Sequence, residues 1–117
     1  MTTYTRWSVS AADLVDMTPV KARDLIVQCF HDAQSEHLAA ASEFIHQPHE
    51  QTDLRNMVIG AVRLAFKEVG GDYDQPTKAT LFQVVEVLAR KSEQRETPKE
   101  IIAHHKGEIE RVLRALD

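Results

Sequence analysis

The most prominent pattern in this chain is the density of apolar positions between Leu54 and Val69. A helix with one side in water carries a single apolar stripe, whereas this stretch is apolar around most of a helical circumference. We therefore expect a helix over about 53–69 that neighbouring helices cover on several sides. A polar strip interrupted by Ile59 and Gly60 should form its one narrow exposed edge. If a second subunit docks on the domain, we expect it at Ile59 and Gly60.

Three further segments repeat apolar residues at the three- and four-residue spacing of a helix. The first begins with Thr18 and Pro19, a capping residue followed by one suited to the first helical position. It is expected to run over about 19–45. The other two helices are expected over about 77–92 and 98–116.

Turn residues separate these helices. Pro48 is expected to end the first long helix, because the residue before a proline is driven out of the helical region. Thr52 or Asp53 should cap the next helix. The pair Gly70 and Gly71 should stop that helix, since glycine readily adopts the positive φ of a helix C-cap.

Short connections between amphipathic helices favour antiparallel neighbours. We therefore predict an all-α fold, an antiparallel (up-down) four-helix bundle in a single domain over 1–117, with a short N-terminal arm over 1–17. Ser10 and Asp13 have the spacing of a capping box, which predicts a short helical turn in the arm. Trp7 should fold back as an apolar lid on the bundle, and exchange of the arm with a second subunit is the alternative.

Composition agrees with one soluble helical domain. The 117 residues are 43% hydrophobic and 27% charged. With four glycines, four prolines and 6% aromatic residues, the chain is poor in the residues that strands and their turns require. The formal net charge is −4, and basic residues after position 89 alternate with glutamates. No nucleic-acid binding is expected, because it normally requires a basic surface.

Cysteine usage and hydropathy bear on location. Cys29 is the only cysteine, so no disulfide within the chain can form and a reducing compartment is expected. The first residues have neither the basic nor the apolar region of a signal peptide. No run approaches the ~18 apolar residues of a membrane span. We expect a cytoplasmic protein with no membrane contact.

Two of the six histidines, His37 and His105, fall on apolar stripes. At the helical rise per residue, His37 lies about 12 Å from the end of its helix and His105 about 10 Å from the start of its own. If those helices are antiparallel neighbours, both imidazoles lie at similar heights, with Glu36, Ser42 and Glu108 as nearby partners. This arrangement permits a metal or small-ligand site. The alternative, which we favour, is two histidines that are satisfied within the core or at its boundary.

Other patterns do not assemble a catalytic site. The segment Glu43-x-x-His46 has the spacing used in di-iron bundles, but it occurs once and such bundles need it twice. Cys29 lies on an apolar stripe, where a thiol behaves as a small hydrophobe. No glycine-rich phosphate loop is present. We expect no enzyme activity and no cofactor.

The function class that remains is a non-enzymatic helical interaction or regulatory module with the capacity to self-associate. Its partner is expected to be another protein or a second copy of the chain. The alternative is a metal- or small-ligand-binding bundle that uses His37 and His105.

Overall fold

The computed structural model describes residues 9–41, 48–94 and 99–116. These ranges contain only helices and their connections, so the predicted all-α class is confirmed. The helices are α1 (Ala11–Leu14), α2 (Pro19–Ala41), α3 (Pro48–Glu68), α4 (Lys78–Gln94) and α5 (Lys99–Arg114). Trp7 lies outside the described residues.

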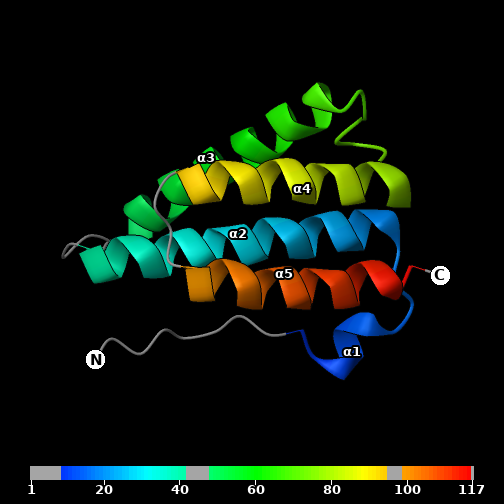
Figure 1. Cartoon of the computed structure of the whole chain (residues 1–117), viewed down its shortest axis with the longest axis horizontal. Helices are drawn as coiled ribbons and strands as arrows, with labels where there is room; N and C mark the ends of the chain where they lie inside the picture. Colours follow the sequence, from blue (N-terminus) through cyan, green and yellow to red (C-terminus); the bar gives the residue numbers. More distant parts are fainter. Residues whose placement is uncertain (1–8, 42–47, 95–98, 117) are drawn as a thin grey trace.

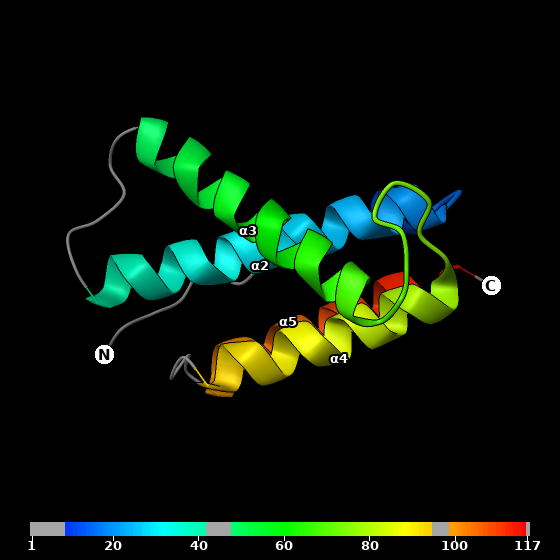
Figure 2. The ribbon, with the colours of Figure 1, turned by 90° about the horizontal axis from the view of Figure 1, so that it is seen from above.

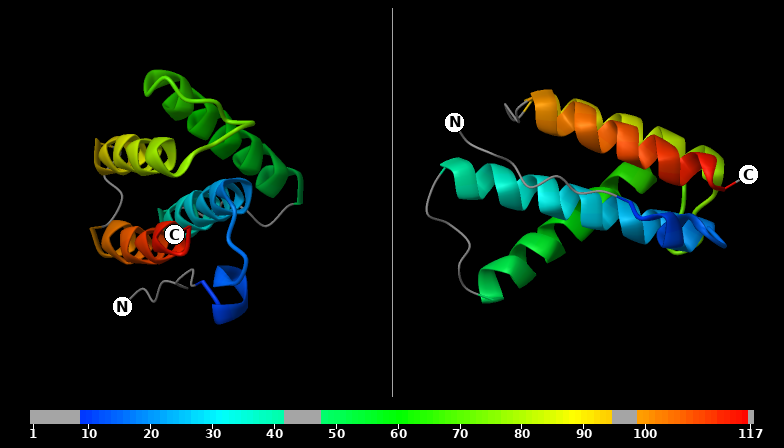
Figure 3. Two further views of the ribbon diagram at one scale, coloured as in Figure 1. Left: turned by 90° about the vertical axis from the view of Figure 1, so that its right-hand side faces the viewer. Right: turned by 90° about the horizontal axis from the view of Figure 1, so that it is seen from below.

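The four long helices form an irregular bundle. Helix α2 packs against α3, α4 and α5, while α3 also packs on α4, and α4 on α5. The chain direction alternates between successive long helices (Figure 1). Helix α3, however, crosses α2 at an open angle (Figure 2). Seen along the bundle in Figure 3, α3 lies on one side and the short α1 on the opposite side.

Capping side chains explain where several helices begin. The Ser10 hydroxyl accepts the amide of Asp13, and the Asp13 carboxylate accepts the amide of Ser10, which confirms the predicted capping box of α1. The Thr18 hydroxyl accepts the amide of Lys21 at 3.2 Å, so α2 begins at the predicted cap. Thr77 caps α4 in the same way, through the amide of Thr80. Each bond satisfies an amide that has no partner within its helix.

The predicted start of the second long helix was wrong. Helix α3 begins at Pro48 rather than near Asp53, and the expected caps Thr52 and Asp53 lie inside it. Proline is well suited to the first position of a helix, because its missing N–H would have no helical partner there. Pro48 therefore starts a helix, whereas we had expected it to end one. The predicted end of the first helix near Ile45 lies outside the described residues.

The predicted stop of α3 at the glycine pair is confirmed. Gly70 adopts a φ of 75°, and the amide of Gly71 donates to the carbonyl of Phe66 at 2.8 Å. This geometry satisfies carbonyl groups at the end of the helix. The last helix, α5, spans Lys99–Arg114, within about two residues of its predicted ends.

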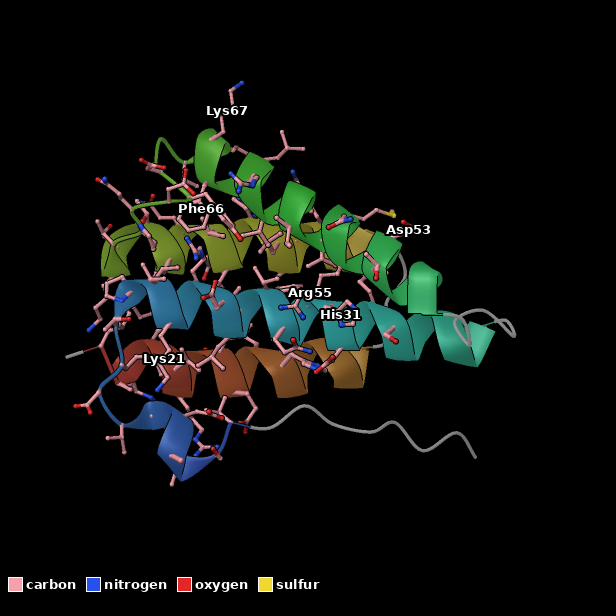
Figure 4. All side chains as sticks on the ribbon, turned by 180° about the vertical axis from the view of Figure 1, so that it is seen from behind. Lys21, His31, Asp53, Arg55, Phe66 and Lys67 are labelled. Carbon is pink, nitrogen blue, oxygen red and sulfur yellow. The ribbon has the colours of Figure 1, made fainter. Side chains whose placement is uncertain are left out.

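A single apolar core lies between the long helices. Its largest fully buried side chain is Phe66 of α3, labelled in Figure 4. Buried residues recur at helical spacing on each long helix, as predicted. They include Ala22, Ile26, Cys29 and Ala33 of α2, Val58 and Val62 of α3, Leu81, Val84 and Leu88 of α4, and Ile109, Val112 and Leu113 of α5.

The expectation that α3 is covered on several sides was wrong. Met57 is 69% exposed and Leu64 is 62% exposed, although both were counted as core positions. Helix α2, which packs against all three other long helices, takes the central place instead. The apolar residues of α3 therefore divide into a buried inner face and a short exposed stripe.

Two glycines provide a test of this description of α3 and its C-terminal turn. A Cβ atom added at Gly60 would meet no atom within 4 Å, so Gly60→Ala should raise the free energy of unfolding by about 0.5–1 kcal/mol through helix propensity. A Cβ at Gly71 would lie 2.9 Å from Cγ2 of Thr80, so Gly71→Ala should lower stability by about 1–3 kcal/mol. Urea unfolding of dilute protein measures both. Equal effects of the two substitutions would contradict the structure.

Candidate functional site

The ligand site predicted at His37 and His105 is only partly described. His105 lies on α5 and is buried, with 4% of its surface exposed. His37 lies on α2, which packs against α5, but its side chain is outside what the structure describes. A site shared by these two histidines therefore stays a prediction.

Glu108, predicted as a partner for these histidines, contacts the N-terminal segment and Arg111. Its carboxylate accepts the amide of Val9 at 2.8 Å and the guanidinium of Arg111 at 3.0 Å. The first bond spans most of the chain and attaches the segment before α1 to α5. Glu108 thus has a structural role in holding the N-terminal segment against the bundle.

A second polar cluster joins α2 to α3. Arg55 of α3 donates to the side chain of Gln28, and Gln28 donates to Asp32 at 2.8 Å. Nδ1 of His31 lies 3.3 Å from the same carboxylate. Nε2 of His31 is buried without a hydrogen-bond partner in the described part of the chain. Among the side chains that the structure describes, which do not include that of His37, no three histidine, cysteine or acidic residues are grouped to hold a metal ion.

Cys29 is fully buried beside this cluster. Burial raises the pKa of its thiol well above the ordinary value, and the carboxylates of Asp32 and Glu108 raise it further. A nucleophilic cysteine needs the opposite shift, because the thiolate is the reactive form. The arrangement suits the predicted role of Cys29 as a small apolar core residue.

A different candidate site lies on the exposed side of α3. We define the outer stripe as Asp53, Met57, Gly60, Leu64 and Lys67. These five residues follow one another at intervals of four, three, four and three. That spacing places them on one face of a helix, as in the contact seam of paired helices. Lys67 points away from the bundle in Figure 4, whereas Phe66 is buried in the core.

The interface residues predicted from the sequence fall on different sides of α3. Gly60 lies at the middle of the outer stripe and opens onto empty space. Ile59 is half-buried and packs against the core. Sequence analysis missed Met57 and Leu64, although the four-three spacing through Gly60 was a signal that could have revealed them.

The loop after α3 helps to fix how this helix lies on α2. The guanidinium of Arg23, on α2, lies 4.4 Å from the ring centre of Tyr73, and that of Arg63, on α3, lies 4.2 Å from it. Arg23 also donates to the Tyr73 carbonyl at 2.7 Å. The ring meets Phe66 edge to face, with centroids 5.8 Å apart. Tyr73 thus links the two helices while α3 keeps its outer stripe exposed.

A shallow groove between α4 and α5 is the competing surface. It encloses about 280 Å³ and has Val85 and Leu113 at its floor and the half-exposed Phe82 at its edge. Its remaining lining residues carry both signs of charge: Glu86, Lys106, Glu110 and Arg114. Phe82 is the large apolar side chain exposed in this groove, whereas the outer stripe carries two that are more exposed, Met57 and Leu64. The outer stripe is therefore the better-defined site.

Comparison with known proteins adds no functional assignment. No protein-family model, curated protein or solved structure matches this chain. None of the helices within the described ranges has the length and apolar character needed to cross a membrane.

We predict that Tyr73 contributes measurably to stability. Tyr73→Ala removes the edge-to-face contact with Phe66 and both cation–π contacts, so it should lower the free energy of unfolding by about 2 kcal/mol. Tyr73→Phe keeps the ring and is the matched control, with a loss of less than about 0.5 kcal/mol. Urea unfolding monitored by circular dichroism measures both. Equal losses for the two variants would show that the ring contacts are not responsible.

We also predict that Cys29 is unreactive in the folded protein. Its raised pKa keeps the thiol protonated, while the unfolded chain releases this proton near the ordinary value of 9.0. The contribution of the Cys29 thiol to folding stability is therefore fully present below about pH 9. It is lost as the pH rises further, because the unfolded state then loses the proton and the folded state keeps it. Thiol modification should be slow at pH 8 and become fast in urea. Rapid modification of the folded protein would contradict this assignment.

Proposed function

We propose that this protein is a non-enzymatic helical interaction module whose docking surface is the outer stripe of α3. The observation that carries this proposal is the alignment of two large, exposed apolar side chains, Met57 and Leu64, on either side of Gly60. Exposed apolar residues scattered singly are normal on protein surfaces, whereas contiguous apolar patches mark interaction sites.

The form of the stripe also suits a helical or flat partner. Gly60 leaves a notch between the two apolar side chains, and charged residues lie at both ends. An apolar centre with a charged border is the usual anatomy of a protein interface. We further propose a cytoplasmic location, supported by the single cysteine that is kept as a buried thiol.

Site-specific photo-crosslinking tests the docking surface. A photoreactive residue is placed at the exposed Asn56, beside the outer stripe, and in a control at Val15, which is 60% exposed and follows α1 on the opposite side of the bundle. We expect one defined adduct from position 56 in cells and none from position 15. Because apolar contact drives the docking, the adduct should disappear when Met57→Gln and Leu64→Gln are added.

These glutamines are compatible with the fold, because both positions are largely exposed and glutamine is a good helix former. An adduct that forms equally at both positions, or one that survives the two glutamines, would count against docking on the outer stripe. The absence of any adduct at position 56 would have the same meaning. Mass spectrometry of the adduct then identifies the partner.

A further inference from the structure

The outer stripe has a symmetry that the proposed docking function does not require. Asp53 lies seven residues before Gly60 and Lys67 lies seven residues after it. Met57 lies three residues before the glycine and Leu64 four residues after it. The stripe therefore reads as charge, apolar, glycine, apolar, charge, with charges of opposite sign at its two ends.

We propose that the outer stripe pairs with the same stripe of a second copy of this chain, with the two α3 helices antiparallel across a two-fold axis near Gly60. This inference rests on the proposed function and names its partner. In a two-fold interface the same patch is used by both subunits, so each contact occurs twice. Asp53 would then face the partner subunit's Lys67, and Lys67 would face the partner subunit's Asp53.

Charge complementarity selects the antiparallel orientation. A parallel pair would place acidic residues together at one end and lysines together at the other, and like charges repel. Other charges near the stripe are engaged within the chain: Glu68 lies 3.5 Å from Lys91 on α4, and Arg63 lies over the Tyr73 ring. Among the side chains that the structure describes, Asp53 and Lys67 have no ion-pair partner, so both charges are available to a second copy. The helix dipoles also favour opposite directions.

Gly60 suits the position of the axis. It lacks a side chain and faces open space, so two helices can approach closely where they cross. Close approach brings Met57 of one copy against the partner subunit's Leu64, and both apolar side chains lose their contact with water. Any larger residue at the centre would hold the helices apart and weaken both contacts.

The interface is small, so the dimer should be reversible. Helix α3 has 21 residues, which corresponds to a length of about 30 Å. One helix face buries less surface than about 1,200 Å², the lower limit for a standard interface. Such a pair therefore belongs to the transient class of complexes. Dimerisation should therefore depend on protein concentration within the micromolar range.

Charge exchange in the full-length chain tests the pairing. Analytical ultracentrifugation across the micromolar range should show a monomer–dimer equilibrium for the natural sequence. Asp53→Lys and Lys67→Asp each turn two attractive contacts into two repulsive ones, so each variant alone should dimerise about tenfold more weakly. An equimolar mixture of the two variants should recover dimerisation, because each repulsive pair is replaced by an attractive one.

The mixture is also the control for folding and net charge. The mixture contains the same two variant chains, and its mean net charge equals that of the natural sequence. If dimerisation recovers, neither misfolding of a variant nor a change in net charge can explain the weaker dimers of the single variants. Leu64→Gln, at an exposed position, should weaken the dimer without altering the circular dichroism spectrum. This second variant tests the apolar part of the interface separately from its charges.

Three outcomes would overturn the inference. They are a natural sequence that stays monomeric throughout, single charge variants that dimerise as strongly as the natural sequence, and a mixture that does not recover dimerisation. The crosslinking experiment tests the docking surface separately in each case. A position-56 adduct with a different protein, lost on adding the two glutamines, would retain the proposed function while rejecting a second copy as its partner.

Discussion

The close packing of α2 against three other helices is the constraint on which the rest of this structure depends. The buried residues described on α2 combine three small side chains, Ala22, Cys29 and Ala33, with the branched side chains of Ile26 and Val27. Small side chains let neighbouring helices approach closely, and a close-packed core tolerates little added volume. The protonated Cys29 thiol belongs to this packing, because it fills a small apolar position between helices. Reactivity at this residue would require access that the packing denies.

The central position of α2 determines which face of α3 is buried. Helix α3 crosses α2 and rests against α4, so its inner face is covered while its opposite face stays in solvent. Tyr73 reinforces the arrangement, because its ring lies beside arginines from both helices. The hydrogen bond from Arg55 to Gln28 secures the other end of the crossing. The exposed stripe is therefore a consequence of how α3 is anchored at two points along its length.

Local sequence signals predicted most of the helix ends, because a cap acts within one turn. Ser10, Thr18 and Gly70 perform the roles expected of their residue types. Pro48 was misjudged because proline is compatible with both the position after a helix and the first position of one. Local reasoning alone could not choose between them.

The candidate site was harder to predict for a different reason. Met57 and Leu64 are apolar, and residue type alone does not distinguish a buried position from an exposed one at an interface. That distinction depends on which neighbours are present, and so on the tertiary crossing of α2 and α3. Of the two interface residues predicted from the sequence, Gly60 faces open space, whereas Ile59, its neighbour, packs against the core. A shift of one residue rotates a helical position by about 100°, so adjacent residues rarely share a face.

The residues of the outer stripe add little to the stability of the isolated bundle. Met57 and Leu64 contribute little to the monomer, since both are more than half exposed, and Gly60 lowers the helix propensity of α3. None of these residues is explained by the stability of the isolated bundle. All three would be explained by the proposed contact with a second helix, which would gain apolar burial from two of them and close approach from the third. In the proposed pair the charges of Asp53 and Lys67 would add orientation, because they attract only when the two helices run in opposite directions.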